Sequence, residues 1–337
     1  MITEKPAPSG AAGAGYAPLP RSTAVVVLGA GRSGTSAITR GVQALGVNLG
    51  NRLRRGRGKN PTGFFEDRDL LAINKRLKRE LGITGESVRL IPPSQWDTPN
   101  VRRLRQNAVR TIERRFGHSR LWGFKYARTL RMLPFWEAVF RELDLDVRYV
   151  VAARNPLSVA HSRAQLDSRR GVQIKSDLEW LANVVPYFRT LSQRLFVVID
   201  YDAVIVNPDG QLERLAQSLR IELTAQARSN IGAFATDFLQ LEMRHSRFSI
   251  EDLEANHEVD PLVRDAYRWL HRLAHDEITA DSEALWSDWQ RIEQALAARA
   301  PLLQYIDSLL DDLRRAQRDP RGPLQALPQL LRFLRGR

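Results

Sequence analysis

The chain of 337 residues contains no cysteine. Disulfide bonds, thiolate nucleophiles and cysteine-ligated zinc are therefore excluded. The sequence also lacks any apolar run of the roughly 18 to 20 residues that a membrane-spanning helix needs. Its first 20 residues are rich in Ala, Gly and Pro and lack the charged and then apolar layout of a secretory signal. We therefore expect a disordered tail over residues 1–21 and a cytoplasmic location.

Acidic residues are scarce in the first part of the chain. From Lys5 to Phe65 the chain has no Asp or Glu but nine Lys or Arg, and the whole chain carries a net charge of +13. A basic excess favours an anionic ligand, an acidic substrate, nucleic acid or a membrane surface, although it also serves solubility. We expect no nucleic acid partner, because the Arg residues are not interleaved with aromatic residues and no known binding motif is present.

Four short runs of apolar and β-branched residues predict buried strands. Segments with helical spacing separate them, and this alternation favours a parallel sheet with helices on both faces. The sequence therefore predicts a three-layer α/β fold. The strand candidates are 24–28, 121–126, 147–153 and 195–201, and the helical segments are 35–46, 67–81, 101–116, 131–143, 156–168, 176–193 and 208–219.

The strand-like runs stop after about residue 222, and the rest of the sequence has a helical pattern. We expect a core over 22–222, followed by a helical remainder over 223–310 that packs on this core. Residues 311–337 mix Leu with Arg and form a basic amphipathic tail. Such a tail either packs loosely on the body or makes peripheral contact with the inner face of a membrane.

The first predicted strand runs into a glycine-rich stretch, GAGRSGTS, at residues 29–36. A strand, a glycine turn and a helix N-terminus together form an anion site, because unpaired N–H groups point outward and the helix dipole favours negative charge. The stretch predicts a phosphate site built from Gly31, Arg32, Ser33, Gly34, Thr35 and Ser36.

Two familiar phosphate motifs are incomplete in this stretch. A dinucleotide site needs an acidic residue about 20 residues further on, but the first acid after the loop is Glu66. An ATP or GTP site needs a lysine where Thr35 stands, and an aspartate at a strand end to hold magnesium. Arg154 follows the run 147–153, although the run 195–201 holds Asp200. An NADP enzyme and an atypical nucleotide kinase or NTPase remain as alternatives.

A second motif, RNPLSVAHS, begins at Arg154, directly after the third predicted strand. Pro156 suits the first turn of a helix, and Ser162 lies about two turns further along. Ligands of a parallel sheet lie at the carboxyl ends of its strands, so we expect Arg154 at the same edge as the glycine loop. An arginine and a hydroxyl group can bind a phosphate through charge-assisted hydrogen bonds.

Two stretches together resemble the nucleotide motifs of sulfotransferases that use 3′-phosphoadenosine-5′-phosphosulfate (PAPS). They are RSGTS at 32–36 and R-N-P at 154–156, with Ser162 eight residues after the arginine. Three further segments, at 60–77, 122–136 and 197–219, are similar to segments of the bacterial branch of this family. The resemblance covers about residues 24–220 and implies a P-loop-like fold. We find no counterpart of the R-K-G-x-x-G element of the eukaryotic cytosolic branch, so what covers the adenosine stays open.

The resemblance implies a role for each matching residue. Arg32 and the glycine loop would bind the 5′-phosphate, and Arg154 with Ser162 would bind the 3′-phosphate. Lys125 would lie near the transferring group and Tyr201 near the adenine. The family needs no metal, and we find no cluster of His, Asp and Glu with convincing metal-ligand spacing in the sequence.

The sequence indicates the general base less directly than it indicates the nucleotide site. One branch of the family uses a histidine two residues after the strand-edge lysine, where this chain has Ala127. Another uses a glutamate after the first helix, and Glu66 in GFFED is its match. His118 and His161 are weaker candidates for the base. The sequence RHSR at 244–247 is expected in a flap that contacts the substrate or the nucleotide.

The sequence indicates the chemical class of the acceptor but not the particular molecule. The glutamate pattern and the basic face favour a hydroxyl (or amine) acceptor on a glycan, glycolipid or other lipid-linked sugar. A non-enzymatic alternative is a basic module that binds an anion or a membrane surface.

Overall fold

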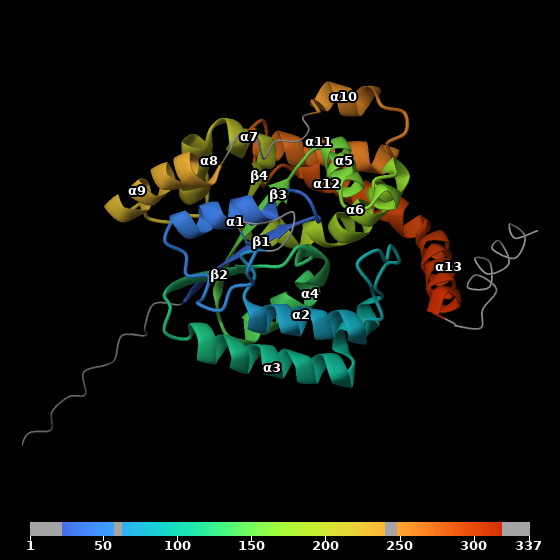
Figure 1. Cartoon of the computed structure of the whole chain (residues 1–337), viewed down its shortest axis with the longest axis horizontal. Coiled ribbons are helices and arrows are strands. Elements are labelled where there is room, and N and C mark those ends of the chain that lie inside the picture. Colours follow the sequence, from blue (N-terminus) through green and yellow to red (C-terminus); the bar gives the residue numbers. More distant parts are fainter. Residues whose placement is uncertain (1–21, 57–62, 240–247, 319–337) are drawn as a thin grey trace, which may run out of the picture.

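The computed structural model describes residues 22–56, 63–239 and 248–318 (Figure 1). The tail expected over 1–21, the sequence RHSR at 244–247 and the tail residues 319–337 lie outside the described residues.

Four parallel strands form one sheet, β1 (Thr23–Gly29), β2 (Leu121–Lys125), β3 (Asp146–Ala153) and β4 (Leu195–Asp200). The strand order is β2-β1-β3-β4, and every pairing is parallel. The four predicted strands are confirmed to within one residue at each end. The last strand stops at Asp200, because that side chain caps the helix that begins at Tyr201.

The predicted helices are also present, with small shifts at their ends. Residue types set several starts: Asp67, Thr98 and Asn155 accept N-terminal N–H groups of their helices. The helices between the strands are α1 (Thr35–Ala44), α2 (Arg68–Glu80), α3 (Pro99–Phe116), α4 (Leu133–Glu142), α5 (Pro156–Ala164) and α6 (Gln173–Phe188). Short 3-10 turns lie at η1 (Pro93–Asp97), η2 (Leu130–Met132), η3 (Ser168–Arg170) and η4 (Arg189–Gln193).

Alternate residues of each strand enter two different hydrophobic cores. In β1, Val25 and Val27 belong to one core, whereas Val26 and Leu28 belong to the other. The first core is completed by α1, α7 (Tyr201–Val206), α8 (Pro208–Ser218), α9 (Ala225–Ala233) and the π-helical turn η5 (Phe234–Phe238). Helices α2 to α4 and α6 cover the opposite face. The fold is therefore a three-layer α/β structure with a parallel sheet at its centre, as the alternation of strands and helices predicts.

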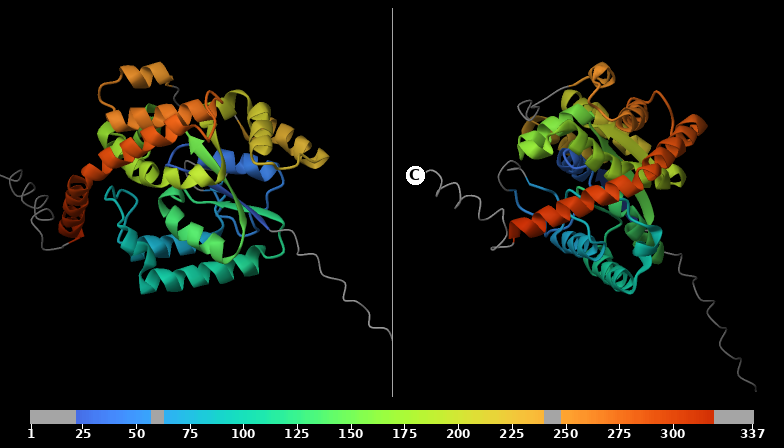
Figure 2. Two further views of the ribbon diagram at one scale, coloured as in Figure 1. Left: turned by 180° about the vertical axis from the view of Figure 1, so that it is seen from behind. Right: turned by 90° about the vertical axis from the view of Figure 1, so that its right-hand side faces the viewer.

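The described part of the chain after residue 222 consists of helices and the loops that connect them. Helices α10 (Ile250–Ala255), α11 (Pro261–Ala274) and α12 (Glu283–Ala298) contribute to the second core. Helix α13 (Ala300–Arg318) continues through residue 310, where the sequence suggested a division. Figure 2 shows α12 and α13 running along one side of the molecule. Among the described helices, none is long and apolar enough to span a bilayer.

Candidate functional site

A cavity of about 700 Å³ opens at the carboxyl edge of the sheet. Residues just beyond each of the four strands line it: Gly31 after β1, Tyr126 after β2, Arg154 after β3 and Tyr201 after β4. This is the edge at which an open parallel sheet binds ligands.

The glycine loop forms one wall of this cavity and leads into α1. No side chain caps the N-terminus of α1, so the first N–H groups of the helix are free for an anion. Gly34 has a φ of 76°, and a Cβ atom added to it would lie 2.0 Å from the ring of Tyr201. Only glycine therefore fits between the helix start and this ring.

The two phosphate motifs meet in the cavity. Arg32 Nε donates a hydrogen bond of 3.0 Å to Ser162 Oγ, and Arg154 Nη1 donates one of 3.4 Å to the carbonyl oxygen of Arg32. The guanidinium carbon of Arg154 lies 4.7 Å from the ring centre of Tyr201. Arg154 Nε is buried and has no partner among the described residues. Two arginines, a hydroxyl group and an aromatic ring thus share one end of the cavity.

Helix α5 positions Ser162 for this contact. Asn155 Oδ1 accepts a hydrogen bond of 3.0 Å from Leu157 N, and Pro156 occupies the first turn. The helix therefore starts immediately after Arg154, and the buried face of α5 carries Ser162 to the cavity. The pKa of Arg32 is lowered by partial loss of solvent and then by the charge of Arg154.

A buried ion pair lies next to the glycine loop. Lys125 Nζ is 3.2 Å from Glu66 Oε1 and 3.3 Å from Ser36 Oγ. Arg54 Nη1 lies 3.2 Å from the other carboxylate oxygen of Glu66. Glu66 and Lys125 are 4% and 3% exposed, so neither charge is screened by bulk water. Burial lowers the pKa of Lys125, and the charge of Glu66 opposes this shift.

The backbone holds Glu66 in place through a short pairing of two loop segments. Arg54 N donates a hydrogen bond of 2.8 Å to the carbonyl oxygen of Glu66, and Leu53 pairs with Asp67 in an antiparallel bridge. Asp67 then caps α2 by accepting hydrogen bonds from Asp69 N and Leu70 N. The carboxylate of Glu66 enters the cavity, whereas Asp67 has a structural role.

The two candidate histidines and the neighbouring acid Asp69 lie elsewhere. Asp69 forms ion pairs with Arg52 and Arg115 and does not line the cavity. His161 is exposed and contacts Gln165, although its neighbour Ser162 reaches the cavity. His118 is exposed just beyond α3 and also does not line the cavity.

The cavity brings together all of the predicted site residues except one. Ser33 is 1% exposed, does not line the cavity and donates its N–H to the carbonyl oxygen of Ala30. The residues that do line it are Gly31, Arg32, Gly34, Thr35, Ser36, Glu66, Lys125, Arg154, Ser162 and Tyr201. Tyr201 does so from the first residue of α7 and not from the end of a strand.

A second set of lining residues was not predicted from the sequence. They come from α2, from the turn after β2, from α5 and η3, and from α6: Lys75, Lys78, Arg128, Arg163, Arg170, Glu179 and Asn183. The sequence contained only weak signals of these residues. They were two pairs of side chains one helical turn apart, Lys75 with Lys78 on α2 and Glu179 with Asn183 on α6. Such pairs occur on many solvated helix faces.

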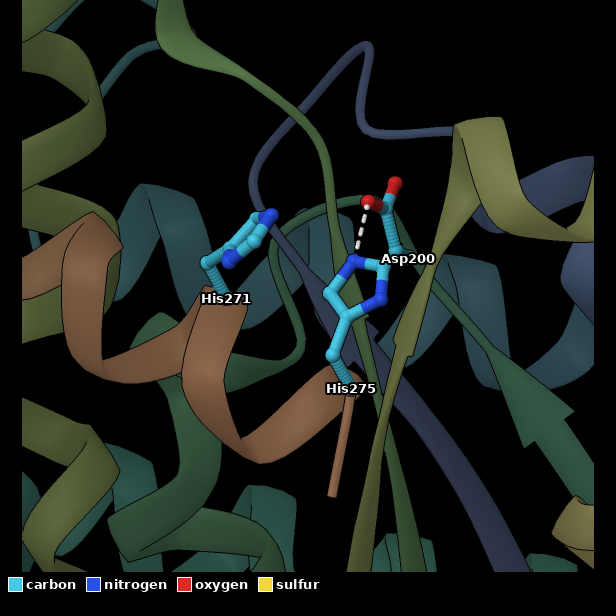
Figure 3. A group of neighbouring side chains, drawn as sticks. All are labelled: Asp200, His271 and His275. Atoms are coloured by element: carbon cyan, nitrogen blue, oxygen red, sulfur yellow. Dashed lines mark hydrogen bonds and ion pairs between the residues drawn. The ribbon is translucent and has the colours of Figure 1, made fainter. Parts of the chain in front are cut away.

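A further group of polar side chains, Asp200, His271 and His275, lies at the end of β4 (Figure 3). Asp200 Oδ1 accepts a hydrogen bond of 2.8 Å from Asp202 N, and Asp200 Oδ2 lies 3.3 Å from His275 Nε2. The ring centre of His271 is 4.3 Å from that of His275. One ligand atom from each of Asp200, His271 and His275 lies within 4.8 Å of the others, a spacing that a metal ion can use. The sequence reading missed this group, and the four-residue spacing of the two histidines on α11 was its signal.

No protein-family model matches this sequence, and no curated protein sequence matches it. Solved structures that resemble the chain are bacterial sulfotransferases. The sulfotransferase domain of the olefin synthase of Synechococcus PCC 7002 is 16% identical, with 82% of this chain and 95% of that chain covered and a TM-score of 0.38. Sulfotransferase STF1 of Mycobacterium tuberculosis H37Rv is 13% identical, with 76% and 77% covered and a TM-score of 0.38. Sulfotransferase STF9 of Mycobacterium avium is 15% identical, with 86% and 77% covered and the same TM-score.

Proposed function

We propose that this protein is a sulfotransferase that moves a sulfuryl group from PAPS to a hydroxyl or amine acceptor, with a glycan or glycolipid as the acceptor class. The observation that carries the proposal is the contact between Arg32 and Ser162, which joins the two phosphate motifs in one cavity. A ligand with phosphates at both its 5′ and 3′ positions needs two such sites side by side.

The donor nucleotide would lie across the end of the cavity formed by the glycine loop. Arg32, the first N–H groups of α1 and the hydroxyl groups of Thr35 and Ser36 would bind the 5′-phosphate. Arg154 and Ser162 would bind the 3′-phosphate, for which the unpaired Nε of Arg154 is a free donor. Tyr201 would contact the adenine, since its ring lines the cavity below Arg154.

Glu66 is the group that we assign as general base. Its carboxylate is buried, lies in the cavity and contacts the side chains of Lys125 and Arg54. The acceptor hydroxyl would give its proton to Glu66 as its oxygen bonds to sulfur. The bond between sulfur and the bridging oxygen would break at the same time, and adenosine 3′,5′-bisphosphate would leave.

We assign Lys125 as the cation that stabilises the sulfuryl group during its transfer. It lies between the base and the loop, with contacts to Glu66 and Ser36. Negative charge spreads over the sulfuryl oxygens and the bridging oxygen in the transition state, as in phosphoryl transfer. A buried cation at this place stabilises such charge strongly, because the surrounding dielectric is low.

Thermal unfolding with candidate ligands tests the donor. Adenosine 3′,5′-bisphosphate, ATP with magnesium, and NADP would be compared at equal concentration. A ligand present at about 100 times its Kd stabilises the fold by about 2.7 kcal/mol. We expect stabilisation by adenosine 3′,5′-bisphosphate. Stabilisation by ATP with magnesium alone, or by NADP alone, would contradict the proposal.

Turnover would then be tested with ³⁵S-labelled PAPS and acceptor extracts. The expected products are sulfated sugars, identified by mass spectrometry. Transfer of label to no acceptor, together with normal nucleotide binding, would instead support a binding module without catalysis.

A further inference from the structure

Part of the cavity is not used by the donor and base assignments above. It is formed by α2, by the turn after β2 and by α6 with the residues that precede it. This second part carries hydrogen-bond acceptors that no other described residue pairs with. It also carries cations that pair with no carboxylate among the described residues. Each observation limits the kind of ligand that can bind there.

Two unpaired acceptor atoms lie one helical turn apart on α6. Glu179 binds Arg163 at 3.2 Å and Arg170 at 3.0 Å through Oε2 alone, which leaves its Oε1 without a partner among the described residues. Asn183 donates its Nδ2 to the carbonyl oxygen of Glu179, and its Oδ1 is likewise unpaired. Both side chains line the cavity and are at most 4% exposed. A buried acceptor without a donor is costly, so these two atoms indicate a ligand with hydroxyl or amide donors.

Three cations form the neighbouring wall. Lys75 and Lys78 lie one turn apart on α2, and Arg128 lies in the turn after β2. Among the described residues, none of the three forms an ion pair with a carboxylate; Arg128 instead donates to the carbonyl oxygen of Gly85 at 2.8 Å. The pKa of Lys78 is lowered by burial and then by the charges of Arg128, Arg131 and Lys75, which shows that like charges are crowded here.

The charge balance of the cavity also calls for a second anion. The cavity is lined by nine Lys and Arg side chains and two Glu side chains, an excess of seven positive charges. A nucleotide with one phosphomonoester, one bridging phosphate and one sulfate carries about four negative charges. The donor alone therefore leaves several cations uncompensated, and three of these are Lys75, Lys78 and Arg128.

We propose that these residues form an acceptor subsite for an acidic sugar. In this subsite Lys75, Lys78 and Arg128 bind a carboxylate or phosphate group, and Glu179 Oε1 and Asn183 Oδ1 accept hydrogen bonds from sugar hydroxyls. The inference rests on the proposed sulfotransferase function and narrows its acceptor from glycans in general to glycans with an acidic unit next to the sulfated position.

Binding of matched probes tests the subsite without turnover. The first pair is a tetrasaccharide of alternating glucuronate and N-acetylglucosamine and its carboxyl-reduced form, and the second pair is glucose 6-phosphate and glucose. Affinities are measured by calorimetry or by saturation-transfer NMR on full-length protein saturated with adenosine 3′,5′-bisphosphate. We expect at least one acidic probe to bind about tenfold more tightly than its neutral partner, as two charge-assisted contacts predict. The pair that shows the difference distinguishes a carboxylate from a phosphate.

The double variant K75Q/K78Q should abolish this preference and leave binding of the neutral probe unchanged. The variant R76Q/R79Q is the matched control, since it removes the same charge from the exposed face of the same helix. It should keep the preference. Asn183→Leu should weaken the acidic and the neutral sugar alike, by about fivefold for one lost hydrogen bond.

The proposal is overturned if no acidic probe binds, if acidic and neutral probes bind equally, or if the preference survives in K75Q/K78Q. Each of these results leaves the donor assignment intact, provided that wild type and variants still bind adenosine 3′,5′-bisphosphate. If wild type fails to bind this nucleotide, the proposed function itself is wrong. The two failures are therefore distinguishable.

Discussion

Arg32 and Ser162 are 130 residues apart in the sequence and are joined by a hydrogen bond of 3.0 Å between Nε and Oγ. Each belongs to a separate motif that follows its own strand of the sheet. Because β1 and β3 are neighbours and parallel, both motifs reach the same edge and the same cavity. The neighbouring cation, Arg154, lies above Tyr201. This arrangement yields direct tests of the donor site.

Arg32→Ala and Arg154→Ala should each weaken the binding of adenosine 3′,5′-bisphosphate by about tenfold or more, because each removes a charged hydrogen-bond donor from a phosphate. Calorimetry measures the change. Arg76→Ala on the exposed face of α2 serves as the control and should bind the nucleotide normally. Wild-type affinity in both cavity variants would contradict the scheme of two phosphate sites.

Glu66→Gln should bind the nucleotide but lose most of its turnover, because the amide cannot accept the acceptor's proton. It should also unfold at a lower temperature, since buried Lys125 loses a charged partner at 3.2 Å. Turnover must therefore be measured below the unfolding transition. Asp69→Asn is the control from the same segment, outside the cavity. If Glu66→Gln turns over normally while folded, another residue is the base.

Gly34→Ala should destabilise the fold and impair nucleotide binding. A left-handed φ of 76° costs a non-glycine residue about 1 kcal/mol or more, and the new methyl group would also overlap the ring of Tyr201. Gly31→Ala is the matched control, because nothing lies within 4 Å of a Cβ atom added there. Thermal unfolding should separate the two variants. Equal melting temperatures would show that Tyr201 does not pack on the loop as described.

His275 should make stability depend on pH. Its hydrogen bond to Asp200 raises the pKa of the ring, so the folded protein keeps this proton to a higher pH than the unfolded chain, whose histidine pKa is about 6.5. The added stability is complete below about pH 6.5 and is lost as the pH rises through the folded pKa. Since the ring is more than a third exposed, we expect less than about 1 kcal/mol.

Melting temperatures of wild type and His275→Gln between pH 5 and 8 measure this effect. The gap between the two should be largest at acid pH and close as the pH rises. His271 acts in the opposite direction, because burial and the charge of His275 lower its pKa, so only the difference between the two proteins is diagnostic. His161→Gln, at an exposed site on α5, is the control substitution. A gap that does not vary with pH would contradict the assignment.

The local elements of the core could be read from the residues alone. Runs such as 24–28 are apolar at every position because both faces of the sheet are covered, and this pattern marks a central parallel strand. Asn155 and Pro156 mark the start of α5 by capping chemistry. The sequence predicts Tyr201 at the end of a strand because it follows the apolar run 195–199, but Asp200 caps the next helix first.

The residues that we assign to the donor could be placed together for a similar reason, since the carboxyl ends of parallel strands share one edge. Ser33 was the exception, because a glycine-rich stretch does not reveal which of its side chains turn inward. The residues that we propose for the acceptor could not be predicted. Lys78 on α2 and Asn183 on α6 carry no motif, and nothing in their local sequence relates the two helices to each other.

The sequence by itself determined the order of strands and helices. It also carried the two motifs to which we assign phosphate binding and the acid that we assign as base, because these depend on residue type and on short spacings. Tertiary structure decided which distant groups share a cavity. It brought Glu66 to Lys125, and it buried Glu179 Oε1 and Asn183 Oδ1 where no other described residue pairs with them. Burial and pairing depend on how helices pack across the sheet, and that packing is a property of the whole chain.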